Sequence, residues 1–501
     1  MGLLSCARTE VFDIPEIYRT DGGQGTGKPT EQPFTIESRS VSASSFGDPV
    51  EWTPFTALTI NCLEGFTPSH DPATDQYGGW KVEAGAEATG FFHIEEIAGR
   101  KWLVTPEGYP YIAVCMNRFS FGSSDRMIRE RDAKFGGRDG WYTQETAFLK
   151  EIGFNSVGAW SQTALINQQT DNTKKIPYIV IYQPTSGYNG QMKAAGLEKE
   201  AYADRSVDDS WYGYPYSFSM IFNEDYEAYA DNVLKDAARY RDDPYCIGYY
   251  VDNELPWVNH GLDYCLGKWP EGHVNHTVAQ KWLDERKGRT GTTLADVTDD
   301  DRKAFVGYCF GEYLSKIRTI LRRYDPNHLF FGPRMAHWNN ELANDYVFKE
   351  AGKYVDAWCF NHYHYWEPDV DRLEHYAAVS GKPGMITEFY VKGEDTDAYY
   401  HSGKSGLTNT SGAGWLVHTQ EERGIFYQNF ALKLLQCPDI IGWNYFMYID
   451  NDPEDPNAAS GETDGNKGIL TCEFERYTPL VDRMKEFNLN VFNLTNYYLG
   501  K

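Results

Sequence analysis

The sequence has few basic residues, few cysteines and no long apolar run. Its 501 residues include 47 Lys and Arg against 72 Asp and Glu, which gives a formal net charge of −25. Nucleic acids and anionic membrane surfaces repel such a protein, so we expect neither as a partner. No apolar run reaches the roughly 18 residues that a membrane-spanning helix needs, so no membrane span is expected either.

Nine cysteines are too few for a disulfide scaffold, and none stands in a CxxC pair that would indicate zinc or a thioredoxin-type motif. We therefore expect no metal and no cofactor. The acidic run Asp450–Asp455 offers calcium ligands, but an exposed acidic loop is the favoured interpretation.

The first residues carry a candidate targeting signal. Leu3-Leu4-Ser5-Cys6 resembles a bacterial lipobox, which would make Cys6 a lipid anchor; a chance match in a frayed terminus is the alternative. The expected location is the cell envelope or the outside of the cell, although the sequence contains no complete signal peptide.

Aromatic residues are abundant: 14 Trp, 36 Tyr and 27 Phe make up 15% of the chain. Such residues can simply fill a core, but the faces of Trp and Tyr are also what proteins use to grip sugar rings. The composition therefore favours an acidic enzyme that acts on a neutral, polar substrate.

The chain divides into a short first part and a long second part. Residues 1–86 are rich in Gly, Pro, Ser and Thr and contain short alternating runs, which predicts a small β-rich N-terminal extension. Residues 87–501 form the predicted catalytic domain, beginning with a hairpin at 90–105.

The catalytic domain alternates apolar strands with amphipathic helices. Strands are predicted at 109–117, 154–160, 177–183, 246–253, 328–334, 355–363, 383–389 and 439–446, and helices at 143–152, 224–242, 300–324, 342–353, 370–380, 421–436 and 477–487. Eight such units predict an α/β fold, a (β/α)8 TIM barrel. An open doubly wound sheet is the runner-up, weakened because no glycine-rich phosphate loop follows a strand.

Carboxylates stand where two predicted strands end. Glu254 follows the fourth strand directly after Asn253, and Glu388 ends the seventh. In a TIM barrel the strand ends meet at the catalytic face. Two carboxyl groups facing one cavity are what glycoside hydrolysis needs, because one protonates the leaving oxygen while the other attacks or activates water.

The pattern resembles the clan-A retaining glycoside hydrolases, and within them the family 50 β-agarases. The resemblance is carried by Asn253-Glu254 with Glu388, and by the segments 243–254, 99–108, 442–453 and 466–469; family 42 β-galactosidases are more distantly similar. The resemblance implies that Glu254 is the acid/base, Glu388 the nucleophile and Asn253 a ligand of the sugar hydroxyl next to the reacting carbon. It also implies a retaining mechanism, with carboxyl groups about 5–5.5 Å apart.

Other strand ends supply candidate substrate-binding residues. By resemblance to related barrels, Tyr363 at the end of strand six is expected to hydrogen-bond the nucleophile; a core Tyr is the alternative. Trp443 is expected to form a platform under the sugar, by resemblance to related barrels, and Trp160 to wall a second subsite; a core role is the alternative for either Trp. The remaining candidates are Asn117, Arg334, His337 and His362.

These observations predict a hydrolase that degrades a galactan polysaccharide, most simply a β-agarase. Three alternatives stay open: another clan-A β-glycosidase such as a porphyranase, a carrageenan-related enzyme or a β-galactosidase; a transglycosylase using the same two carboxylates; and a carbohydrate-binding barrel without hydrolytic activity. The sequence does not distinguish them, because they differ in what reaches the intermediate and in the shape of the subsites.

Overall fold

The computed structural model describes residues 28–40, 49–69, 73–82, 85–194, 220–267, 269–336, 340–410, 413–457 and 463–499. Two of the residues singled out above, Cys6 and His337, lie outside these ranges.

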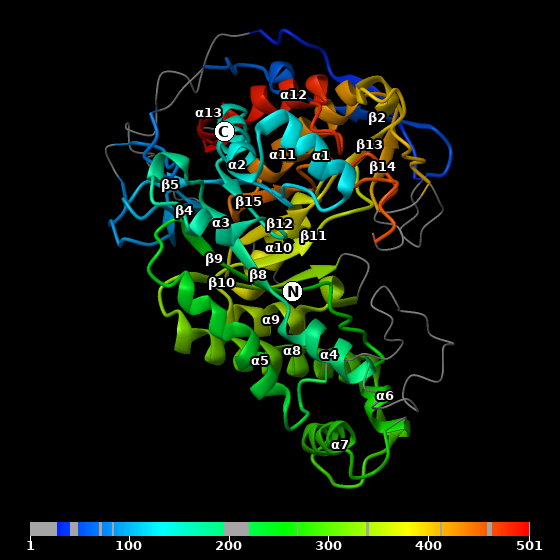
Figure 1. Cartoon of the computed structure of the whole chain (residues 1–501). Helices are drawn as coiled ribbons and strands as arrows, with labels where there is room; N and C mark the ends of the chain where they lie inside the picture. The colour runs from blue at the N-terminus through cyan, green and yellow to red at the C-terminus, as the bar shows by residue number, and fades with distance from the viewer. Residues whose placement is uncertain are drawn as a thin grey trace.

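Eight parallel strands close into a barrel, as the alternating pattern predicts (Figure 1). In chain order they are β6 (Ala113–Met116), β7 (Ser156–Val157), β8 (Tyr178–Tyr182), β9 (Cys246–Asn253), β10 (Leu329–Ala336), β11 (Trp358–Asn361), β12 (Gly384–Glu388) and β15 (Ile440–Tyr445). Every predicted strand overlaps one of them. The (β/α)8 prediction is confirmed, and the doubly wound alternative is wrong because β15 pairs with β6 and closes the sheet.

The first predicted strand, 109–117, is in fact two. Its first part is β5 (Pro110–Tyr111), which pairs antiparallel with β4 (Arg100–Val104); β4 also pairs with β3 (His93–Ile97). This is the predicted hairpin, extended by a third strand. The two-residue turn at Ala98 and Gly99 has positive φ at both positions, the geometry that joins twisted antiparallel strands.

Helices surround the barrel. Seven of those described match predicted ranges, six of these with bounds within five residues, and the other six described helices were not predicted. They are α1 (Asp125–Phe135), α2 (Arg138–Glu151), α3 (Thr163–Asn167), α4 (Pro184–Ala194), α5 (Tyr226–Leu234), α6 (Gly261–Gly267), α7 (Val274–Lys287), α8 (Asp299–Tyr324), α9 (Asp345–Tyr354), α10 (Val370–Ser380), α11 (Gln420–Gln436), α12 (Thr478–Asn488) and α13 (Val491–Leu499). The predicted helix 224–242 is shorter, because α5 gives way to a 3₁₀ turn at Lys235–Arg239. None of the described helices is long and apolar enough to cross a membrane.

The longest helix, α8, shows how the sequence sets an element's limits. Thr298 and Asp301 form a capping box at its start, and Asp residues fill the first turn. Arg322 and Arg323 lie in its last turn. These charges oppose the helix dipole at both ends, so the helix is stabilised where it begins and where it stops. In Figure 1, α8 lies beside α5 and α9 along one side of the barrel, and α6 and α7 project beyond it.

The described part of the N-terminal extension is β-rich, with β1 (Phe34–Ser38) and β2 (Thr53–Ala57) pairing antiparallel. It packs against the other end of the chain: Glu31 forms an ion pair with Arg483 of α12, and Trp80 stacks on Phe492 of α13. Figure 1 shows these blue segments beside the red helices. A further short pair, β13 (Val391–Gly393) with β14 (Trp415–Val417), lies in the segment after β12 and accepts a hydrogen bond from Ser38.

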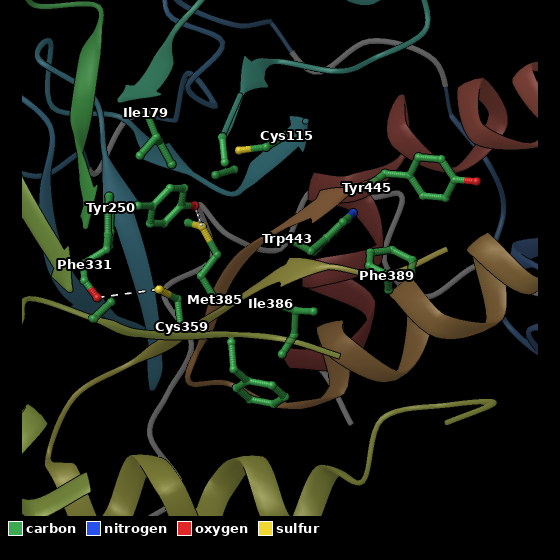
Figure 2. Packing of buried hydrophobic residues seen from close by; sticks show 14 of the residues in the cluster. Cys115, Ile179, Tyr250, Phe331, Cys359, Met385, Ile386, Phe389, Trp443 and Tyr445 are labelled. Carbon is green, nitrogen blue, oxygen red and sulfur yellow. Dashed lines mark hydrogen bonds between the residues drawn. The ribbon is translucent and has the colours of Figure 1, made fainter. Parts of the chain in front are cut away.

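Strand side chains that point inward fill the barrel, and those that point outward pack against the surrounding helices. Figure 2 shows Tyr250 and Met385 meeting, where the Tyr250 hydroxyl contacts the Met385 sulfur at 2.9 Å. Trp443 and Phe389 belong to the outer layer, where they contact Tyr427 of α11. The strands are therefore buried on both faces, which explains their continuous apolar sequences.

Candidate active site

The strand register brings the two predicted carboxylates to the same end of the barrel. Arg334 of β10 pairs with Asn253 of β9, and Asn361 of β11 pairs with Glu388 of β12. Glu254 follows Asn253 directly. Both Glu side chains are almost enclosed, with exposed fractions of 5% for Glu254 and 7% for Glu388. The C-terminal ends of four neighbouring strands thus build one polar cluster, as expected of a TIM-barrel active site.

Glu388 receives hydrogen bonds on both of its oxygens. Arg334 Nη2 donates to Oε1 at 2.5 Å, and the Tyr363 hydroxyl donates to Oε2. Burial lowers the pKa of Arg334, but the charge of Glu388 outweighs it and raises the pKa above its ordinary value. Burial and the same charge raise the pKa of Tyr363 well above 10, so its proton stays on the phenol. Both oxygens of Glu388 are therefore held in place by a donor from a neighbouring strand end.

Glu254 lies in a different environment. The side-chain amide of Asn361 donates to Oε1 of Glu254 at 2.7 Å, and the backbone N–H of Glu254 donates to the carbonyl of Arg334 at 2.8 Å. This last contact fixes the turn after β9 against β10. The two carboxyl groups therefore have different donors: a side-chain amide for Glu254, and a guanidinium and a phenol for Glu388.

Asn253 joins the two halves of the cluster. Its Oδ1 accepts from Arg334 Nη1 at 2.9 Å and from Asn361 Nδ2 at 3.2 Å. A continuous chain of hydrogen bonds thus runs from Glu254 through Asn361, Asn253 and Arg334 to Glu388. Moving any member shifts the others, so the distance between the carboxyls is held by the whole network.

The backbone around the cluster is strained. Asp252 and Glu254, on either side of Asn253, have φ of 57° and 53°. Arg118, Trp160 and His364, which follow β6, β7 and β11, also have positive φ. Residues with a Cβ rarely adopt this conformation, and each costs of order 1 kcal/mol or more. Such conformations gather where side-chain direction matters for function.

Five of the predicted residues lie together at this end of the barrel: Glu254, Glu388, Asn253, Arg334 and Tyr363. Trp160 joins them, because the Arg334 guanidinium carbon lies 5.9 Å from the centre of its ring. Trp160 is only partly buried, so one part of the ring remains accessible beside the cluster. Its predicted role as a subsite wall stays a prediction.

Asn117 lies beneath the cluster. Its side chain donates to the Thr387 carbonyl at 2.8 Å and accepts from Asn444 at 3.0 Å, and it has no exposed surface. A Cβ on Gly158 would lie 2.4 Å from Asn117 Oδ1, so only glycine fits beside this pair. The prediction that Asn117 binds a sugar hydroxyl is wrong for this arrangement; the residue supports Thr387 and the floor of the site.

Trp443 and His362 lie on the helix-facing side of the barrel. Trp443 is fully buried and donates from Nε1 to the Tyr427 hydroxyl at 3.2 Å. The His362 ring contacts Phe360, Tyr365 and Phe430, and burial lowers its pKa to about 3. Side chains alternate along a strand, so each residue next to an inward one packs outward. The predicted platform role of Trp443 and sugar contact of His362 are therefore wrong.

Three polar residues of the site were not predicted to act in it. Asn361 donates to Glu254 and Asn253, the Thr387 hydroxyl donates to the side-chain Oδ1 of Asn361 at 2.9 Å, and Asp252 anchors the turn that carries Asn253. Asn361 does stand at the end of an apolar strand, which is the signal that could have identified it. Thr387 and Asp252 give no such signal, because neither is the last polar residue of its strand.

Only part of the acidic segment after β15 is the exposed loop that was expected: Glu454 is exposed, but the first three residues of the segment are buried. Asp450 is fully buried and accepts hydrogen bonds from the Tyr477 hydroxyl and from the backbone N–H groups of Lys467 and Gly468. Asn451 and Asp452 are buried as well. Within the described residues, no group of three or more His, Cys, Asp or Glu side chains is arranged to hold a metal ion.

A cavity of about 280 Å³ lies by the loops that follow β6 and β15. Its lining is mainly polar and includes Arg118, Ser120, Asn451 and Asp452. Arg118 directly follows Asn117, which lies beneath the cluster. The cavity is therefore at the same end of the barrel as the carboxylates.

The sequence of the chain was compared with those of known proteins. No family model matches the chain. Beta-agarase B of Vibrio sp. (strain JT0107) is 22% identical over 519 residues, which cover 85% of this chain and 51% of that protein. Beta-agarase A of the same strain is 24% identical over 409 residues, covering 72% of this chain and 37% of that protein. The chain thus spans about half, or less, of the length of these relatives.

This chain is also similar to solved structures. The crystal structure of BpGH50 superposes with a TM-score of 0.75 and 26% identity, covering 95% of this chain and 99% of that one. The chain resembles the family 50 β-agarases. The agarase AgWH50C has a TM-score of 0.66 at 20% identity, with 85% of this chain and 67% of that chain covered, and supports the fold.

Proposed function

We propose that this protein is a glycoside hydrolase that cleaves β-galactosidic linkages in agarose or related agar oligosaccharides. The observation that carries the proposal is the network joining Glu254 and Glu388, because it differentiates two carboxyls at the catalytic end of a barrel. The likeness to BpGH50 and to the two Vibrio beta-agarases supports the choice of substrate.

The proposed mechanism is retaining. Glu388 attacks the anomeric carbon while Glu254 donates its proton to the departing glycosidic oxygen, which yields a glycosyl-enzyme ester and a free chain end. Glu254, now a carboxylate, takes a proton from water as the water attacks the same carbon and releases Glu388. The hydrogen bonds from Arg334 and Tyr363 support this assignment, since they fix the position of the Glu388 carboxyl group before attack.

The neighbouring side chains are assigned by position. Asn253 would bind the hydroxyl next to the reacting carbon, with its orientation set by Arg334 and Asn361. Trp160 would pack against a sugar ring beside the cleavage point. The polar cavity at Arg118 and Asn451 would receive a further sugar unit of an extended chain. His337, beyond the end of β10, stays a proposed hydroxyl ligand.

One experiment tests substrate and stereochemistry together. The protein is incubated with agarose, porphyran, carrageenans and a plain β-galactoside, and the products are identified. Proton NMR in the first minutes then reads the anomeric signal. A β-product appearing first supports retention, whereas an α-product would mean inversion, with carboxyls about 6.5–9.5 Å apart, and would remove Glu388 as nucleophile.

Other outcomes of the same experiment decide between the remaining classes. Longer oligosaccharides in place of hydrolysis products would identify a transglycosylase. Tight binding without turnover of any substrate would identify a carbohydrate-binding barrel. Cleavage of porphyran, a carrageenan or the plain galactoside, with agarose left intact, would move the enzyme to another β-galactoside specificity.

We also propose that the protein acts outside the cytoplasm, with Cys6 as a lipid anchor in the cell envelope. Polysaccharides are too large to cross a membrane, so an enzyme that starts their degradation must meet them outside. Labelling of the precursor with radioactive palmitate in the producing cell tests the anchor. Label in the wild type that is lost on Cys6→Ser supports it; an unlabelled, freely secreted protein contradicts it.

A further inference from the structure

Asp252 precedes Asn253 and Glu254, yet its side chain points away from them. The carboxylate accepts from the backbone N–H groups of Thr185 and Ser186, at 3.0 and 2.8 Å, in the first turn of α4. The Tyr313 hydroxyl of α8 also donates to it, at 3.0 Å. One buried carboxylate therefore joins the end of β9 to two helices.

The backbone conformation explains why this tether matters. Asp252 and Glu254 both have positive φ, so the chain reverses its side-chain directions around Asn253. The reversal places Asn253 toward Arg334 and Glu254 toward Asn361 while Asp252 faces the helices. A strained turn persists only when surrounding contacts hold it. The three donors to Asp252 supply such contacts on the side opposite to the site.

We propose that Asp252 is a positioning residue, which locks the turn carrying Asn253 and Glu254 to α4 and α8 and so keeps the acid/base carboxyl on Asn361. The proposal deepens the proposed function and rests on it for the role of Glu254. Asp252 does not touch substrate; it acts through the backbone of its two neighbours.

The tether is sensitive to pH. Burial raises the pKa of Asp252 to about 6, although the hydrogen bonds from Ser186, Thr185 and Tyr313 oppose the rise. The phenols that face it from neighbouring helices are Tyr313 on α8 and Tyr226 on α5, and both have pKa values raised well above 10 by burial and by the charge of Asp252. On its own strand the next ionisable group is Glu254. As pH falls through about 6, the Asp252 carboxylate becomes protonated and accepts hydrogen bonds less strongly. Its contacts with α4 and α8 therefore weaken.

The test uses two substitutions with opposite expected effects on the pH profile of kcat/KM. Asp252→Asn removes the titrating group and weakens the tether: kcat falls by about tenfold to a hundredfold, KM changes little, and the acidic limb moves to lower pH. Tyr313→Phe removes a hydrogen bond that favours the ionised carboxylate: the acidic limb moves to higher pH, with a small change in kcat at the optimum.

Asp325→Asn is the matched control. Asp325 is a buried carboxylate at the opposite end of the barrel, and its replacement should lower thermal stability without moving the acidic limb. A purely structural role for Asp252 would give the same result as this control, with stability lowered and the limb in place, and would overturn the proposal. If Asp252→Asn does not fold, Tyr313→Phe alone decides: a shift of the acidic limb to higher pH supports the proposal, and an unchanged limb overturns it.

A crystal structure of the Asp252→Asn protein separates this proposal from the proposed function. If wild-type protein cleaves none of the galactans, the function fails, but the structure still decides the positioning role. Displacement of the Glu254 carboxyl from Asn361 supports it. An unchanged Glu254–Asn361 hydrogen bond overturns it, whatever the activity.

Discussion

The two ends of β9 and β10 each hold a buried network of charged groups, and the networks differ in kind. At the start of these strands, Asp325 accepts from the backbone N–H groups of Asn327 and His328, from the Tyr249 hydroxyl and from the His328 ring. At their far end, Arg334 and Glu388 meet, and Arg334 Nε is buried with no hydrogen-bond partner among the described residues.

The pKa values follow the same division. Burial would raise the pKa of Asp325, but the hydrogen bond and charge of His328, together with the Tyr249 hydroxyl, outweigh it, so the pKa lies below its ordinary value. At the other end burial prevails, and the pKa of Asp252 rises to about 6. Hydrogen bonds and charge therefore outweigh burial for Asp325, whereas burial prevails for Asp252 at the end that carries the proposed catalytic groups. Four substitutions sharpen or break this comparison.

The largest effect is expected for Glu388→Ala at the reactive end. Without the nucleophile, turnover should fall by at least about a thousandfold while oligosaccharide binding persists. Product analysis and titration calorimetry measure the two quantities. Glu388→Gln is the matched variant, because its amide oxygen can still accept from Arg334. Normal activity in either folded variant would remove Glu388 from the mechanism.

Glu254→Ala should lose about a hundredfold to ten-thousandfold in kcat on substrates with poor leaving groups. Aryl glycosides with good leaving groups need less protonation and should lose less. Added azide should restore part of the activity on these aryl substrates, since azide needs no base: it attacks the glycosyl-enzyme in place of water, releases Glu388 and leaves as a glycosyl azide. Equal losses on both substrate types, without rescue, would contradict the acid/base role.

Asp325→Asn tests the stable end. It should lower the free energy of unfolding by about 1–3 kcal/mol at neutral pH and leave kcat unchanged. Because the folded-state pKa of Asp325 is depressed, its contribution is present above the unfolded-state pKa and is lost as pH falls through the folded value. The stability difference between wild type and variant should therefore shrink in acid. Thermal unfolding at several pH values measures it.

The smallest effect is expected for Trp160→Ala, which should raise KM for agar oligosaccharides about tenfold or less and leave the fold intact. Its partly buried ring adds contact area beside the cluster, and losing stacking on one sugar ring costs about 1 kcal/mol. Trp443→Phe is the paired control, because that ring packs on α11 and should affect Tm without affecting KM. The reverse pattern would restore Trp443 as the platform.

Much of the fold could be predicted because parallel barrel strands are buried on both faces. Their apolar runs, such as 246–253 and 439–446, stand out against amphipathic helices. The same reasoning finds Glu254 and Glu388, since a charge that ends an apolar run must lie at the end of the barrel. The division of 109–117 could not be predicted, because β5 and β6 are equally apolar and only tertiary pairing separates them.

Side-chain direction could not be predicted at the strand ends. Trp443, His362 and Tyr363 all look like active-site residues from sequence, yet only Tyr363 reaches Glu388. Which of two adjacent residues faces inward depends on register and on residues such as Asp252, whose positive φ interrupts the alternation. Buried acidic segments pose the same difficulty. The sequence predicts that Asp450 is exposed, but the fold brings the Tyr477 hydroxyl into hydrogen-bond contact with it.

The left-handed backbone at Arg118, Trp160 and His364 has a consequence for how this protein can evolve or be engineered. Glycine adopts that conformation without a steric penalty, so a glycine at any of the three positions would relieve local strain while giving the unfolded chain more conformational freedom. Arg118 and Trp160 lie by the cavity and the carboxylates, and the same change there would remove the very side chains that the strain presents. Glycine at Arg118 or Trp160 therefore sets relaxation of the backbone against the proposed function, and variants selected for heat tolerance alone should lose activity when they change these positions.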